Sequence, residues 1–124
     1  MNLAQLRAID VHTHAEVSVR EPMDELWKTR TEAMAKYFKG ATDRPTVTEV
    51  AAYYRARNIG CVIFPVDSER ASGEKRVSNE EVAELAAENS DVMIAFASID
   101  PAKGRMGARE ESRSRRSRAT SPAG

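Results

Sequence analysis

Two histidines near the N-terminus have the residue type and spacing that point most directly to chemistry. They lie two positions apart in Asp10-Val11-His12-Thr13-His14, and they are the only histidines among the 124 residues. Side chains alternate across a β-strand, so Asp10, His12 and His14 would share one face. Two neutral imidazoles on one face can converge on one cation, such as zinc, iron, nickel or copper. The segment predicts a metal site with His12 and His14 as ligands. Asp10 would orient one of these ligands without contacting the metal itself.

Three apolar segments are the strands that would position this site. Residues 8–14 form a short strand candidate, and the histidines end it. Residues 60–66 and 92–99 are nearly continuous apolar runs, typical of parallel strands covered by helices. In a β/α barrel the C-terminal ends of the strands form the active-site face. The position of the histidines therefore strengthens the interpretation as a ligand site, and a chance pairing stays open beside it.

Helix start signals separate these strands. Thr46 with Glu49, and Ser78 with Glu81, both have the spacing of a capping box. Apolar residues recur at helical spacing after each box. The order is therefore strand, insert, helix, strand, helix, strand, which predicts an α/β fold with a parallel sheet.

The insert over residues 15–45 is longer than a simple connection between a strand and a helix. Its apolar residues recur at helical spacing: Met23, Leu26, Trp27, Met34, Tyr37 and Phe38. A helix here would pack against the core, or it would cover a ligand site with Trp27 or Phe38 in the lining. Both interpretations stay open at this point.

Two segments resemble a known family. Residues 9–14, IDVHTH, look like the N-terminal signature of the amidohydrolase superfamily. Residues 96–101, FASIDP, are similar to a segment common in its amidohydrolase-related branch. That branch includes the aminocarboxymuconate-semialdehyde decarboxylase-like and resorcylate decarboxylase-like enzymes. The resemblance extends over residues 8–107.

The resemblance implies a fold and an activity. Members of the family form a (β/α)8 TIM barrel around one catalytic divalent metal ion, often zinc. They hydrolyse C–N, C–O or C–C bonds, or they remove carboxylate from small acids. His12 and His14 match the first two metal ligands of the family. The resemblance thus implies a metal-dependent hydrolase or decarboxylase acting on a small, carboxylate-bearing substrate.

The chain departs from the family in its later part. The family takes a further His from a middle strand and an Asp from the last strand, and a barrel needs eight strands and about 250 residues. We therefore expect residues 1–107 to be the N-terminal part of a barrel, with about three βα units. A site with two histidines would bind metal weakly, because catalytic zinc usually has three protein ligands. Whether this chain is active alone stays open.

The C-terminal segment 108–124 differs in composition from the rest. It has five basic and two acidic side chains and no large apolar residue, so we expect a disordered tail. The loss of apolar patterning near Gly107 suggests a reading-frame change or a truncation. An alternative function is a non-catalytic small α/β domain whose basic tail binds a polyanion such as RNA. A degenerate product without a function of its own is the third possibility.

Other polar residues follow the second and third strands. Asp67 and Asp100 could contact a substrate, but turn or helix-capping roles are the simpler interpretation. Three basic residues after the second strand could hold an anionic substrate or form a solvated loop: Arg70, Lys75 and Arg76. Cys61, at the start of an apolar run, is interpreted as a small buried residue and not as a nucleophile.

Composition excludes several classes of protein. No apolar run approaches the roughly 18 residues of a membrane span, and the single cysteine forbids a disulfide within the chain. The zero net charge gives no whole-chain reason to expect nucleic acid as a partner. No export signal is visible, so a cytoplasmic location is expected.

Three parallel strands would leave a long unpaired edge and one poorly covered face. Such edges favour aggregation or oligomer formation. The sequence therefore predicts marginal stability, and a cooperative thermal transition of the isolated monomer well above about 60 °C would contradict this prediction.

Overall fold

The computed structural model describes residues 1–21, 25, 28–29, 32–33, 44–105, 107 and 109. Within them the chain is an α/β structure. Its elements are, in order, η1 (Leu3–Gln5), β1 (Ala8–Ala15), α2 (Val47–Arg55), β2 (Ile59–Pro65), α3 (Glu69–Ser72), α4 (Asn79–Glu88), β3 (Met93–Ala95) and η2 (Pro101–Lys103). The helix predicted around Trp27 and Phe38, and the tail predicted over 108–124, lie outside the described residues except for isolated positions.

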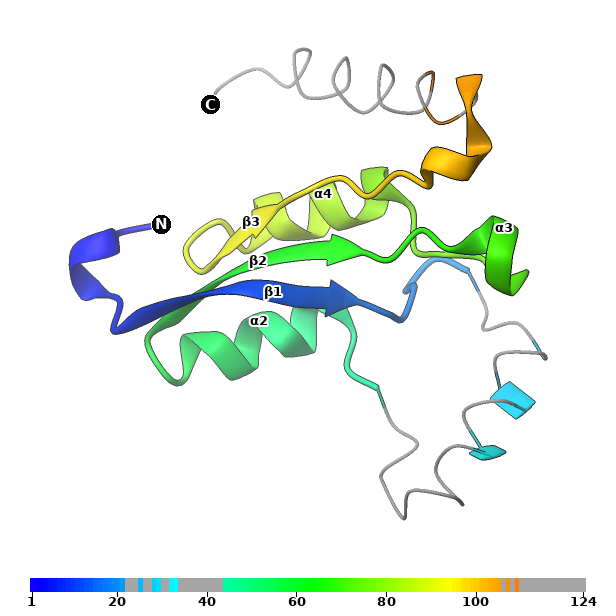
Figure 1. Cartoon of the computed structure of the whole chain (residues 1–124). Helices are drawn as coiled ribbons and strands as arrows, with labels where there is room; N and C mark the ends of the chain where they lie inside the picture. The colour runs from blue at the N-terminus through cyan, green and yellow to red at the C-terminus, as the bar shows by residue number, and fades with distance from the viewer. Residues whose placement is uncertain are drawn as a thin grey trace.

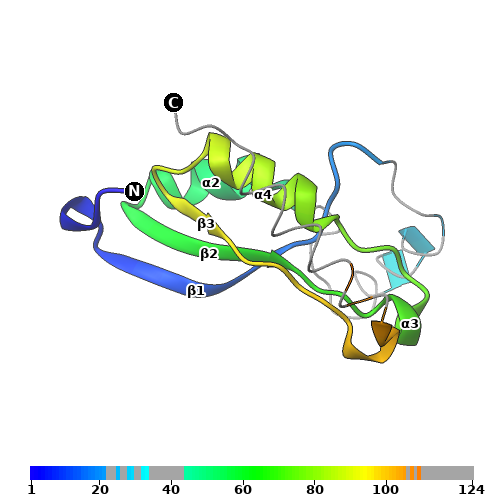
Figure 2. The same cartoon turned by 90° about the horizontal axis from the view of Figure 1, so that it is seen from above.

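The three strands form one parallel sheet in the order β1-β2-β3, as the sequence predicts (Figure 1). Helices α2 and α4 cover the same face of this sheet (Figure 2). The core lies between the helices and that face, and its fully buried members include Val47, Ala51, Cys61, Ile63 and Val82. Apolar burial of this kind is the main stabilising contribution.

The two predicted capping boxes differ in the structure. At α2 the box is complete, because Thr46 and Glu49 each accept from the other's backbone N–H. At α4 the Ser78 side chain accepts from the Glu81 backbone N–H. The Glu81 carboxylate does not reach back, and it accepts instead from Ser18 Oγ at 2.7 Å and from the backbone N–H of Val19 at 2.8 Å. This carboxylate therefore holds the segment after β1 against α4.

Strand β3 is shorter than the predicted run of residues 92–99. It ends at Ala95, although the Phe96 N–H still donates to the Ile63 carbonyl. Beyond it, the buried side chain of Asn79 takes both backbone groups of Ser98: Oδ1 accepts at 2.9 Å and Nδ2 donates at 3.0 Å. These bonds replace strand pairing, so the predicted long edge at the third strand is wrong and the edge is short.

The face of the sheet opposite the helices carries apolar side chains that no described element covers fully. Ile94 pairs with Val62 on this face and is 45% exposed. The N-terminal end of this face is closed. There, a Cβ on Gly60 would come within 2.9 Å of the Leu6 side chain and 3.2 Å of Met1, so a larger residue would displace this packing.

Among the described residues, no helix combines the length and hydropathy that crossing a membrane would require.

Candidate metal-binding site

The rings of His12 and His14 lie side by side at the C-terminal half of β1. Their centroids are 4.8 Å apart, with the ring planes inclined by 52°. Phe64 of β2 meets both rings edge-on, at 5.4 Å from His12 and 5.1 Å from His14. Strand β1 thus brings the two predicted ligands together, and an aromatic ring packs against both.

Asp10 does not share the face of the histidines, so the prediction of one common face is wrong. The pairing of β1 with β2 is irregular between Asp10 and Thr13, where three steps along β1 match two steps along β2, from Cys61 to Ile63. This extra residue is a β-bulge, and it shifts the alternation of side chains. Asp10 and Thr13 pair with core residues beneath the helices, whereas His14 pairs with Phe64 on the open face.

Asp10 nevertheless contacts the backbone of a predicted ligand. Its Oδ1 accepts from the His12 N–H at 2.9 Å, and its Oδ2 accepts from the Tyr54 hydroxyl at 2.6 Å. The bond from Tyr54 and then the bond from His12 hold the pKa of this carboxyl below its ordinary value. Asp10 is therefore ionised at neutral pH, and it acts on the position of His12 through the backbone.

The donor set fits a divalent metal in part. Two imidazoles with neighbouring rings suit zinc, which binds histidine nitrogen at about 2.0 Å. Within the part of the chain that the structure describes, no group of three or more His, Cys, Asp or Glu side chains could hold a metal ion. Two histidines alone are fewer than the three protein ligands that a catalytic zinc usually has.

A cavity of about 350 Å³ opens beside His14 at the C-terminal ends of β1 and β2. Arg44, Lys75 and Arg76 line it together with Glu16 and Glu74. Arg44 pairs with Glu16, and Lys75 pairs with Glu21 outside this lining. Arg76 also pairs with a carboxylate, that of Asp67, so each of the three basic side chains that line the cavity has an acidic partner.

Asp67 is a buried ion-pair partner and neither a turn residue nor a helix cap. Its side chain is 0% exposed and lies 3.1 Å from Arg76 Nε and 2.8 Å from Lys103 Nζ. Burial raises the pKa of Asp67, but the bonds from Lys103 and the Asp100 N–H, with the charge of Arg76, outweigh it and lower the pKa. Because the Arg76 side chain is only 4% exposed, the prediction of a solvated loop is wrong at that residue.

The other predicted residues have simpler roles. Asp100 caps η2, since its carboxylate accepts from the Ala102 N–H at 2.8 Å. Arg70 is exposed and donates to the Ala102 carbonyl. Cys61 is buried, as predicted, and burial raises the pKa of its thiol to about 11. A thiol that is protonated at neutral pH is a poor nucleophile.

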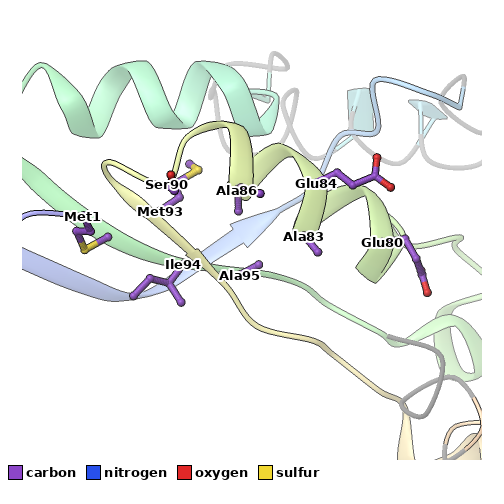
Figure 3. Close-up of a pocket in the computed structure, with 10 residues that line it drawn as sticks. Met1, Glu80, Ala83, Glu84, Ala86, Ser90, Met93, Ile94 and Ala95 are labelled. Atoms are coloured by element: carbon purple, nitrogen blue, oxygen red, sulfur yellow. The ribbon is translucent and has the colours of Figure 1, made fainter. Parts of the chain in front are cut away.

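A second, larger cavity of about 560 Å³ lies along the free edge of the sheet, between α4 and β3 (Figure 3). Its lining is mostly apolar, from Met1 at one end to Ala83 and Ala86 of α4 and Met93 and Ile94 of β3. Figure 3 shows Glu80 and Glu84 at its rim. Its mostly apolar lining differs from the surroundings of the histidines. Among the described residues that line it, no three His, Cys, Asp or Glu side chains form a group that could hold a metal ion.

No protein-family profile, no curated protein and no solved structure matches this chain.

Proposed function

We propose that this chain carries part of the metal site of a metal-dependent hydrolase or decarboxylase of the amidohydrolase-related kind. In this proposal His12 and His14 are ligands of one divalent ion, zinc in the first instance, and the sheet is the first part of a (β/α)8 barrel. A bound divalent ion of this kind lowers the pKa of a water or polarises a substrate oxygen. Further ligands would come from βα units beyond the three described.

The neighbouring imidazoles carry this proposal. Their rings are 4.8 Å apart at the C-terminal end of a parallel strand, on the face that the helices leave open. In a barrel that face is the interior, and that end of the strands holds the active site. The apolar side chains on the open face, such as Ile94, are also of the kind that fills a barrel interior.

The cavity beside His14 supports a carboxylate-bearing substrate. Arg44 and Lys75 line the cavity with partly exposed side chains, and a substrate carboxylate would replace the Glu16 and Glu21 carboxylates with which they pair. Arg76 stays buried against Asp67. In this role Arg44 and Lys75 orient the substrate beside His14, and they take no part in bond cleavage.

Zinc titration of the whole chain tests the proposal. We expect one zinc ion per chain, and we expect His12→Ala or His14→Ala to weaken binding by more than about tenfold, since even residues that only support a ligand cost that much. Glu84→Gln is the control, because Glu84 is an exposed carboxylate on α4 that pairs with Arg20, away from the histidines. Unchanged zinc affinity in both histidine variants would show that the ligand assignment is wrong.

A further inference from the structure

The β-bulge in β1 decides on which face the two histidines lie. In a regular strand Asp10, His12 and His14 would face the same side. The extra residue between Asp10 and Thr13 leaves these two on the helix side and both imidazoles beside Phe64 on the open side. Without the extra residue, His12 and His14 would lie on the helix side of the sheet together with Asp10, because a shift by one residue exchanges the faces.

A single hydroxyl group joins the two ends of this bulge. Tyr54 donates to Asp10 Oδ2 at 2.6 Å, and its hydroxyl lies 3.1 Å from Thr13 Oγ1. The other oxygen of the same carboxylate accepts from the His12 N–H inside the bulge. Asp10, Thr13 and the Tyr54 hydroxyl thus form one hydrogen-bonded unit that spans the irregular part of the strand.

Tyr54 is held firmly enough to serve as an anchor. It lies on α2, and its partly buried ring packs against the core. Helix α2 begins at a complete capping box and packs against β2. The position of the hydroxyl is therefore fixed by the helix and not by the strand that it contacts.

From this arrangement we infer that Tyr54 is a positioning residue for the histidine pair, since it locks the bulge that places His12 and His14 on the open face beside Phe64. This inference rests on the proposed metal site for its purpose, but its structural part does not depend on metal. Tyr54 itself touches neither imidazole in the way a ligand or a catalytic residue would. It acts through Asp10 and Thr13.

The test compares Tyr54→Phe with Tyr53→Phe in the whole chain. Tyr54→Phe removes the hydroxyl and keeps the ring, whereas Tyr53 is 55% exposed on the same helix and forms no bond to β1 among the described contacts. In metal-free protein, we expect Tyr54→Phe to lose the nuclear Overhauser effects between the imidazoles and the Phe64 ring and to speed exchange of the His12 amide. Tyr53→Phe should leave both unchanged. Zinc affinity should fall by roughly tenfold in Tyr54→Phe only.

The outcomes separate this inference from the proposed function. Wild-type protein that binds no zinc would refute the metal site, and the metal-free spectra would still decide the role of Tyr54. Contacts of the imidazoles with Phe64 and a His12 exchange rate that stay unchanged in Tyr54→Phe would overturn the inference. Should Tyr54→Phe fail to fold by circular dichroism, Thr13→Val removes the partner hydroxyl at the other end of the bulge, and the same two readouts decide.

Discussion

Single carboxylates of the chain differ widely in how much they contribute electrostatically. Asp67 is wholly buried between Arg76 and Lys103, whereas Asp91 forms an exposed pair with Arg55. A buried carboxylate cannot be hydrated if its partners are lost, but an exposed one can. The sequence does not reveal this difference, because the partners of Asp67 lie 9 and 36 positions away and only the fold brings them together.

Replacing Asp67 should therefore be much more costly than replacing Asp91. We expect Asp67→Asn to lower the free energy of unfolding by about 3 kcal/mol, because Arg76 is left buried without its counter-charge. The matched Asp91→Asn should lower it by less than about 1 kcal/mol. Urea unfolding measures both, and equal losses would contradict the burial of the Asp67 pair.

Acid should weaken the fold through the same residue. The pKa of Asp67 lies below its ordinary value of 3.8 in the folded chain. A lowered folded-state pKa contributes stability above the ordinary value, and this contribution is lost as the pH falls through the folded-state pKa. The urea midpoint should therefore fall as the pH drops from about 5 to below 3.8, and less steeply in Asp67→Asn. Identical slopes in the two proteins would exclude Asp67 as a source.

The bulge at Asp10 is the feature of the site that sequence reasoning missed, although one signal was present. An Asp whose side chain bonds the backbone N–H two residues on is the pattern of an Asx turn, and the Asp10–His12 bond has that spacing. Such a turn within a strand interrupts strict alternation. The pairing of His12 and His14 was predictable from spacing, but the place of Asp10 beneath the helices was not.

At the scale of elements, local signals predicted most of the fold. Apolar runs located β1 and β2 to within a residue, and the Thr46 box located the start of α2. Prediction failed where a distant side chain competes with local pattern. The Asn79 side chain forms hydrogen bonds with the backbone N–H and carbonyl of Ser98, and β3 ends early. No residue within 92–99 predicts this from the sequence.

The Thr46 cap should contribute measurably to α2. Thr46→Ala removes the acceptor for the Glu49 N–H and should lower the free energy of unfolding by about 1 kcal/mol. Thr48→Ala is the control, because Thr48 is exposed within the same helix and should change stability by less than about 0.5 kcal/mol. If both substitutions had the same effect on thermal unfolding, the cap would not be formed in solution.

The whole molecule presents a sheet with one covered face and one largely uncovered face. Both outer strands, β1 and β3, have an edge with no strand partner among the described residues. Such edges and apolar faces promote association with other chains. This shape is what the partial-barrel proposal requires, and it also makes association of copies an expected property.

Association should depend on the open face. Ile94→Thr replaces an apolar side chain that is 45% exposed beside the free edge, and it should reduce the weight-average mass in sedimentation experiments. Val19→Thr is the control, because Val19 is 54% exposed in the segment held by Glu81 on the helix side. Equal association of the two variants would place the contact elsewhere.

The claim that His12 and His14 together bind one metal ion has a direct test in the chemical shifts of their ring nitrogens. The chain has only two histidines, so the signals that disappear in His12→Ala assign both imidazoles. During zinc addition to the whole chain, both imidazoles should shift together and stop shifting at one zinc ion per chain. Shifts that saturate at different zinc concentrations, or that do not occur, would contradict the shared site and with it the proposed function.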